Sequence, residues 1–404
     1  MRIAIVGNFG LTYKATMAAR ALPLARELAE RGHRVALFLP EDPWPADPAS
    51  IGSAVRLASL GPSLVGRRES KLLLAIRHLI LGLRLTVVAF RYRPDVLYAF
   101  KPKAYAGLAL LIFWLLREVG LSRTRLALDT DDWEGTGGWA EREHGLALTR
   151  ALVSWHERWC LGHADVVTVA SRGLAELVDK HRASSVYLPN AAAPTSPGWR
   201  PGRRQPLHSR LGLGDVPIVL AYTRFAEFAP ERLLAVFQAI AAEVPDARLI
   251  VAGKGLRGEE AAFKQLADRA GLAAAIHVLG WKSIDELPDV FAAADVALYP
   301  LDDTLLNRTK CPMKLVDLLL AGVPVVADRV GQAAEYVDDG RTGVLVPARD
   351  VSAMARAAAT ILQSPSNGRE LGAAARTAML TSWTWKQQAD LVARELRLGG
   401  ERHR

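Results

Sequence analysis

The sequence predicts an α/β protein made of two Rossmann-like domains, each built on a doubly wound parallel sheet. Short apolar runs alternate with helix-length segments through the first half of the chain, and a second such series follows in the other half. Between them, residues 191–214 are rich in Pro, Gly, Arg and Ser and show no periodicity, which is typical of a linker. We therefore expect one domain over residues 1–190 and another over residues 215–382.

The apolar runs give the strands of each domain in order. In the first domain, strands are expected at Arg2–Val6, Arg34–Leu39, Asp95–Tyr98, Arg125–Asp129, Asp165–Val169 and Ser185–Leu188. In the second domain, they are expected at Pro217–Tyr222, Ala247–Ala252, Ile276–Leu279, Asp295–Tyr299, Pro324–Ala327 and Val344–Val346. Helices are expected at about 15–31, 230–242, 259–270 and 353–362, with a last one at about 386–398.

Composition indicates a cytoplasmic globular protein. The chain has 404 residues, half of them apolar, which is ample for two or three domains with large cores. Its two cysteines, Cys160 and Cys311, do not make a disulfide framework and suit a reducing compartment. The first residues lack the layout of a signal peptide and match a buried strand instead.

The net charge of +9 is concentrated in one apolar region. Between residues 56 and 125 there are thirteen Lys and Arg residues against three acidic ones. In and directly after the apolar stretch Leu72–Phe90, Arg77, Arg84 and Arg91 recur every seven residues and lie near one helical face. Such a segment can associate peripherally with an anionic membrane, although a core helix with a solvated basic face is an equal alternative. No nucleic-acid recognition motif accompanies the charge.

The stretch Asn307–Ala327 carries the clearest functional pattern. It is expected to form a basic loop, an amphipathic helix, a tight turn and a buried strand. Lys310 and Lys314 lie beside the helix N-terminus, where phosphate can be held, and Asp317 follows one turn later on the same side. A cationic end with a carboxylate suits a ligand that has both phosphates and hydroxyls. The alternative is a surface helix with ordinary solvated charges.

This stretch resembles the donor-binding motif of retaining GT-B glycosyltransferases of the family 4 type, the glycosyl transferases of group 1. That motif has two glutamates with seven residues between them, followed by Ala-x-x-x-Gly-x-Pro-Val-Val. With Gly322–Val326 in register, the second acidic position is Asp317 and the first is Thr309. The resemblance implies that Asp317 binds the nucleotide ribose. It assigns the donor sugar to the segment of Thr309, Cys311, Pro312 and Met313, where Thr309 departs from the acidic pattern.

The resemblance also implies a reaction and an architecture. A sugar would pass from a nucleotide-diphosphate sugar to an acceptor hydroxyl, without a cofactor. The basic apolar segment adds the hypothesis that the acceptor is a lipid-linked or cell-envelope glycan at the inner face of the cell membrane. The first domain would bind the acceptor and the second the donor, facing each other across a cleft. The last segment, about 383–404, would cross back to the first domain. A GT-B nucleotide-sugar epimerase and a non-catalytic GT-B subunit remain alternatives.

Cations for the leaving diphosphate are expected from two places. Family members place Gly-Arg after the first strand of the second domain and a Lys five residues later. Arg224 matches the arginine, but position 229 is alanine. We therefore expect Arg224 and Lys310, with Lys314 third, to clamp the phosphates.

Acidic residues close a strand of the first domain. Asp129, Asp131 and Asp132 cluster there, and one of them is expected to have a raised pKa suited to handling a proton. The pattern Asp-x-Asp also matches the metal signature of GT-A glycosyltransferases, but the donor half here is the second domain. Asp131 and Asp132 are the acceptor-side candidates, with a structural strand-end cap as the alternative.

The remaining candidates are single residues at strand ends. The resemblance implies that the turn ending at Gly10 faces the donor diphosphate and the acceptor, with a plain tight turn as the alternative. Lys254 lies in Gly253–Gly258, which matches a dinucleotide fingerprint literally but can equally be a structural turn. Trp281 can stack on a base or belong to the core, and Glu335 follows the strand at Pro324–Ala327. No Cys and His grouping has metal-ligand spacing, so no metal site is predicted.

Overall fold

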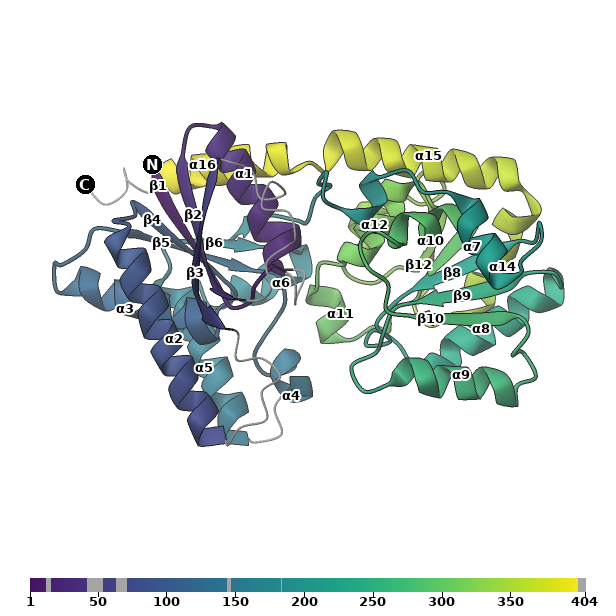
Figure 1. The fold of residues 1–404 in the computed structure, drawn as a ribbon, viewed down its shortest axis with the longest axis horizontal. Coiled ribbons are helices and arrows are strands. Elements are labelled where there is room, and N and C mark those ends of the chain that lie inside the picture. Colours follow the sequence, from purple (N-terminus) through teal and green to yellow (C-terminus); the bar gives the residue numbers. More distant parts are fainter. Residues whose placement is uncertain (12–15, 42–53, 63–70, 144–146, 183, 399–404) are drawn as a thin grey trace. The chain divides into compact units, whose positions relative to one another are not determined.

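The computed structural model divides into two compact units (Figure 1). It describes all residues except 12–15, 42–53, 63–70, 144–146, 183 and 399–404. The first unit comprises residues 1–190, 309–311 and 385–404, and the second comprises residues 191–308 and 312–384. Each unit has its own sheet and its own apolar core.

The sheet of the first unit has seven parallel strands in the order β3-β2-β1-β4-β5-β6-β7. The strands are β1 Arg2–Gly7, β2 Arg34–Glu41, β3 Val55–Pro62, β4 Val96–Phe100, β5 Arg125–Thr130, β6 Val166–Val169 and β7 Val186–Tyr187. The central strands β1 and β4 are almost entirely buried, as expected of a parallel sheet covered on both faces. All their carboxyl ends therefore lie at one edge of the sheet.

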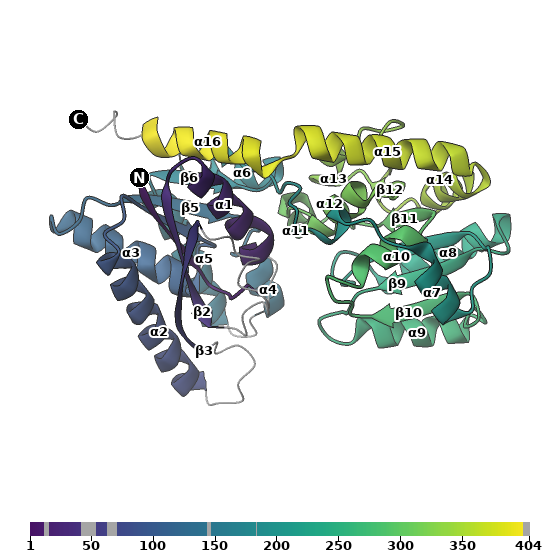
Figure 2. The ribbon, with the colours of Figure 1, turned by 45° about the horizontal axis from the view of Figure 1, so that its top comes forward.

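Helices cover both faces of this sheet. On one face, α1 (Leu22–Glu30), preceded by a π-helical turn over Met17–Ala21, packs beside α16 (Trp385–Leu398) in both views (Figures 1 and 2). On the other face lie α2 (Lys71–Arg91), α3 (Ala104–Glu118) and α5 (Ala147–His163). The short helices α4 (Trp139–Glu143) and α6 (Arg172–Val178) complete the unit.

The C-terminal helix α16 belongs to the first unit although it follows the second in the chain. Its buried residues include Trp385, Ala389 and Val392. Arg31, just after α1, donates from Nε to Asp390 at 2.6 Å and from Nη2 to the carbonyl of Lys386 at 2.7 Å. A helix returning to the first domain, as the resemblance implied, is therefore present.

The second unit has a six-stranded parallel sheet in the order β10-β9-β8-β11-β12-β13. The strands are β8 Ile218–Tyr222, β9 Arg248–Ala252, β10 Ile276–Gly280, β11 Val296–Tyr299, β12 Val325–Asp328 and β13 Val344–Val346. The helices are α7 Arg204–Leu211, α8 Pro230–Glu243, α9 Glu259–Arg269, α10 Leu287–Ala293, α11 Leu305–Thr309, α12 Met313–Ala321, α13 Ala333–Tyr336, α14 Val351–Gln363 and α15 Pro365–Ser382.

The structure adds elements that the sequence pattern did not indicate. Strand β3 and helix α15 have no counterpart among the expected elements. The segment 191–214, expected as a linker, contains a 3-10 turn over Pro197–Trp199 and helix α7, and it clusters with the second unit. Within the described part of the chain, no helix is both long and apolar enough to cross a membrane.

Candidate functional site

A buried lysine lies among three carboxylates at the carboxyl edge of the first sheet. Lys101 directly follows β4, and its Nζ lies 2.8 Å from Asp131, 3.1 Å from Asp132 and 3.0 Å from Glu134, which follow the neighbouring strand β5. Lys103 adds a second ion pair to Glu134. The lysine thus occupies the position among the carboxylates where a metal ion would be expected, which argues against the Asp-x-Asp metal signature.

The cluster separates the pKa values of its two aspartates. Burial alone would lower the pKa of Lys101, but the charges of Asp131, Glu134 and Asp132 raise it well above its ordinary value. Burial would raise the pKa of Asp131, and Lys101 overcomes this effect and lowers it. For Asp132, burial wins and the pKa is raised. Asp132 is also the more exposed of the two, so it is the better placed to exchange a proton.

Asp129 has a structural role beneath this cluster. Its carboxylate accepts hydrogen bonds from Nε and Nη2 of Arg20 at 2.6 and 2.7 Å, and this ion pair is almost completely buried. The hydroxyl of Thr168 donates to it at 2.6 Å. Arg20 lies 5.9 Å from the ring of Trp385 in α16, so the helix covers this ion pair. Asp129 therefore holds the end of β5 in place and is not available to a ligand.

The segment Thr309–Cys311 clusters with the first unit. Ser171 donates to the carbonyl of Thr309 at 2.5 Å, and the backbone amide of Asn190 donates to Sγ of Cys311 at 3.3 Å. Thr309 and Lys310 are buried, and the positive charge of Lys310 lowers the pKa of Asp132. Lys310, predicted as a phosphate clamp, is thus brought close to the acceptor-side carboxylates.

The second unit gathers three of the predicted donor-binding residues around Tyr222. This tyrosine ends β8, and Nζ of Lys314, in the first turn of α12, lies 3.6 Å from the centre of its ring. Burial and the charge of Asp317 raise the pKa of Tyr222, whereas the charge of Arg224 lowers it, so all three groups are its neighbours. Pro312 forms the N-cap position of α12, and Met313 is its first residue.

Asp317 has the environment of a ligand-binding carboxylate. It is 6% exposed, and burial raises its pKa to about 7 in spite of the charge of Lys314. Its Oδ1 has no hydrogen-bond partner among the described residues. A buried carboxylate oxygen without a partner costs free energy unless a donor reaches it. A ribose hydroxyl is such a donor.

The glycine-rich turn after β9 is a structural turn. The amides of Gly255 and Arg257 donate to Glu260 and Glu259 of α9, so carboxylates of the chain occupy the place of a phosphate. Gly253 has a φ of 130°, and a Cβ there would lie 1.8 Å from the carbonyl oxygen of Thr223. Lys254 itself is exposed beside this turn.

Two further candidates lie at strand ends. Trp281, next to β10, is 69% exposed, which excludes the core interpretation and leaves its ring free to stack on a base. Gly10 is buried just after β1. Near it, Asn8 donates to the carbonyls of Phe100 and Lys101, each at 3.4 Å, and ties the ends of β1 and β4 together.

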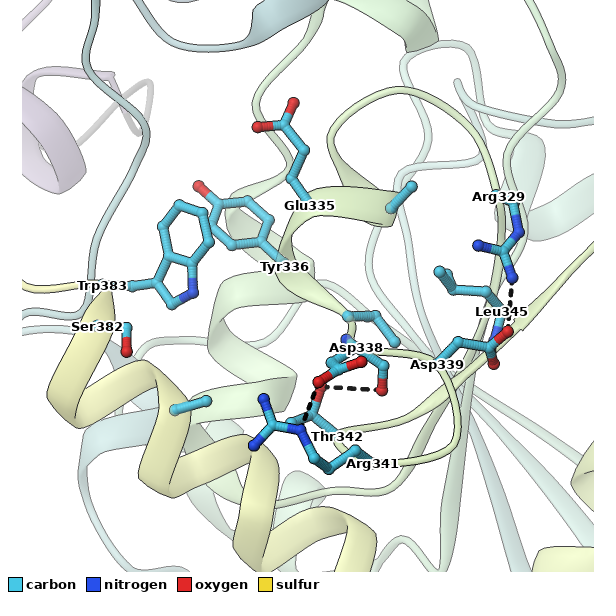
Figure 3. A pocket seen from close by; sticks show the side chains of 13 residues that line it. Arg329, Glu335, Tyr336, Asp338, Asp339, Arg341, Thr342, Leu345, Ser382 and Trp383 are labelled. Atoms are coloured by element: carbon cyan, nitrogen blue, oxygen red, sulfur yellow. Dashed lines mark hydrogen bonds and ion pairs between the residues drawn. The ribbon is translucent and has the colours of Figure 1, made fainter.

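Glu335 lies in α13 at the rim of a cavity of about 420 Å³ (Figure 3). The neighbouring Tyr336 meets Trp383 with 4.6 Å between ring centroids. The opposite wall holds the ion pairs Arg329–Asp339 and Arg341–Asp338.

Sequence reasoning missed Lys101 and Tyr222. Both end or follow a strand whose neighbour carries a predicted site residue, and the carboxyl ends of parallel strands meet at one edge. That rule could have found Lys101 beside Asp131. The pairing of Lys314 with Tyr222 depends on how α12 packs, and no local signal reveals it.

Comparison with known proteins identifies the family. The model described as "Glycosyl transferases group 1" matches residues 216–364, and the "Glycosyl transferase 4-like domain" matches residues 15–191. A GDP-mannose-dependent alpha-(1-6)-phosphatidylinositol monomannoside mannosyltransferase of Mycolicibacterium smegmatis is 31% identical over 57% of this chain and 61% of its own length. The chain thus spans less than two thirds of that relative.

Solved structures agree on the fold. Sucrose-phosphate synthase from Thermosynechococcus elongatus superposes with a TM-score of 0.71 at 19% identity, covering all of both chains. The catalytic domain of starch synthase IV from Arabidopsis thaliana gives a TM-score of 0.74 at 12% identity, covering 99% of both. With these matches over both units, the chain belongs to the glycosyl transferases of group 1 and has the GT-B fold.

Proposed function

We propose that the protein transfers a sugar from a nucleotide-diphosphate sugar to an acceptor hydroxyl with retention of anomeric configuration. The observation that carries this proposal is Asp317, a buried carboxylate whose Oδ1 has no hydrogen-bond partner in the described part of the chain, with Lys314 and Arg224 around the same tyrosine. A ribose hydroxyl suits the carboxylate, and phosphates suit the two cations. A nucleoside diphosphate carries both groups.

In the proposed reaction, the bond between the anomeric carbon and the diphosphate oxygen breaks, and the leaving diphosphate takes the electron pair. Arg224 and Lys314 stabilise the charge that develops on it. The acceptor oxygen bonds to the anomeric carbon, and its proton passes to Asp132, whose raised pKa suits this role. Lys310 limits that rise in pKa. We propose that no metal takes part, because Nζ of Lys101 already lies among the carboxylates where a metal ion would bind.

The donor to test first is GDP-mannose. The name of the mycobacterial relative specifies this donor and a phosphatidylinositol monomannoside acceptor. At 31% identity over part of both chains, this supports a donor class, and the site itself carries no group that selects one base. UDP- and ADP-sugars therefore belong in the same panel.

The test is to incubate the protein with each nucleotide sugar and an acceptor extract, and to follow release of nucleoside diphosphate. Release that needs acceptor supports transfer, and an α-linked product from an α-linked donor, seen by NMR, supports retention. Release without any acceptor would favour an epimerase. No release with any donor, together with no donor binding by calorimetry, would favour a non-catalytic subunit. Activity that is lost on chelation and restored by manganese would overturn metal independence.

A further inference from the structure

The outer face of α2 carries a row of exposed apolar side chains, whereas the outer face of an ordinary solvated helix is polar. Its exposed large apolar side chains are Leu73, Ile76, Leu79, Ile80, Leu83, Val87 and Phe90. They recur at helical spacing over almost five turns, while Leu81, Leu85 and Ala89 on the opposite side are buried in the core. The apolar stripe therefore faces away from the unit.

Contacts along α3 fix how α2 and α5 lie beside it. His78 of α2 stacks on Tyr105 at 5.2 Å, and Phe90 meets Phe113 at 5.9 Å, so α2 and α3 run parallel. On the other side of α3, His156 of α5 packs at Gly107, and His163 lies 5.1 Å from Trp114. These two contacts show that α5 runs parallel to α3 as well.

Both flanking helices begin about two turns before α3 does. Helix α3 begins at Ala104, just before Tyr105, on which His78 stacks, and about one turn before Gly107, at which His156 packs. By contrast, α2 begins at Lys71 and α5 at Ala147. Figure 1 shows these first turns of α2 and α5 at the same end of the unit. We call them the α2–α5 overhang, made of residues 73–80 of α2 and 148–155 of α5.

The part of the overhang from α5 is apolar too. Leu148 is 73% exposed, Leu152 is 55% exposed and Trp155 is 53% exposed, and their spacing places them on one side of the helix. The first turns of two helices, one on each side of α3, thus present aliphatic side chains and an indole at one end of the unit. Exposed apolar groups gathered in this way mark an interaction surface.

We propose that the α2–α5 overhang docks on an anionic membrane surface. Arg84 and Arg91 are exposed on the same helix face as the apolar stripe, and the region has a large excess of basic residues. Apolar side chains with flanking arginines match the acyl boundary and the negative headgroups of such a surface. A second copy of the chain fits less well, because a symmetric contact would bring the arginines of both copies together.

The position of the overhang favours a lipid-borne acceptor. The N-terminus of α3 follows β4 through Lys101 and Lys103, so the overhang extends beyond the strand edge that carries the carboxylate cluster. A lipid-borne hydroxyl at the membrane surface would be presented to this edge. This step rests on the proposed function, whereas the docking itself does not.

The test is flotation of the full chain with vesicles of phosphatidylcholine alone and with vesicles in which about a third is phosphatidylglycerol. We expect binding to the anionic vesicles only, weakened by salt. The double variant Ile76→Glu/Ile80→Glu and the variant Leu152→Glu should each lose about tenfold or more in binding. Arg84→Gln should lose about fivefold. The control Val119→Glu/Leu121→Glu, equally exposed at the other end of α3, should bind as the wild type does.

Each other outcome overturns the proposal. Absence of binding to anionic vesicles would do so, as would equal binding by the overhang variants and the control. A dimer in sedimentation that Ile76→Glu/Ile80→Glu dissociates, without vesicle binding, would assign the surface to a second copy. Nucleotide release with a soluble acceptor, measured on the same variants without vesicles, should stay unchanged. This assay with a soluble acceptor distinguishes failure of membrane docking from failure of the proposed reaction.

Discussion

At the scale of single residues, Asp317 lowers the stability of the folded protein when it is ionised, and it is the residue proposed to bind the nucleotide ribose. Its carboxyl has a pKa of about 7 in the folded protein, above that of an unfolded chain, because it is buried. Between about pH 4 and pH 7 the unfolded state is therefore the more ionised one. The protonated carboxyl therefore contributes its full share to the free energy of unfolding below about pH 4. This contribution is lost as the pH rises to about 7.

The variant Asp317→Asn should remove this pH dependence. Relative to that of the wild type, its free energy of unfolding should be larger at pH 8 than at pH 5, by about 2–4 kcal/mol, so the variant is relatively more stable at pH 8. Urea unfolding at the two pH values measures this difference. The variant should nevertheless bind nucleoside diphosphate more weakly, because the amide is a poorer acceptor for the ribose. Tight binding by the variant would contradict the assignment.

Lys310 gives a second prediction at this scale. Lys310→Ala should lower kcat by about 100-fold, as loss of one charge at a reacting centre does. It should also raise the pKa seen on the acidic side of the pH profile, because Lys310 lowers the pKa of Asp132. Arg308→Ala is the matched control, since Arg308 is exposed and pairs with Asp303. Equal effects of the two variants would remove Lys310 from the site.

At the scale of elements, the strand ends β4 and β5 are held together by charge. Lys101→Met would leave Asp131 and Asp132 without this cation and Glu134 with Lys103 alone, at a cost of about 3–5 kcal/mol near neutral pH. The cost should shrink near pH 4.5, because the carboxyls then take up protons. Thermal unfolding at both pH values tests this, and Lys101→Met/Glu134→Gln should recover part of the loss. A pH-independent cost would indicate a packing defect instead.

The elements also show how much of the fold and of the candidate site could be predicted from the sequence. The strands of both sheets follow from apolar runs, because a buried parallel strand leaves a short continuous signature. Helix α15 gives no such signature, since its packing on α12 depends on glycine. A Cβ on Gly372 would lie 2.0 Å from the carbonyl oxygen of Gly322. Tyr222 was missed because its partner Lys314 is distant in the chain and no local signal reveals the pairing, whereas the pairing of β4 with β5 could have indicated Lys101.

At the scale of the whole molecule, the first unit is discontinuous in sequence. Deletion of residues from 385 onward should expose the surface that Trp385, Val392 and Leu396 now cover. Calorimetry should then show the transition of the first unit lowered by about 10 °C or more, with that of the second unit unchanged. Asp390→Asn, which removes only the partly exposed ion pair to Arg31, should have little effect. A shift of both transitions together would show that the units unfold as one.

The return of α16 to the first unit has a consequence for synthesis on the ribosome. The second unit is complete once residue 384 has emerged, whereas the first still lacks the helix that covers Arg20 and Asp129. Domains generally fold as they emerge, starting from the N-terminus. Here the order of completion is reversed, so the half made first waits for the last segment of the chain.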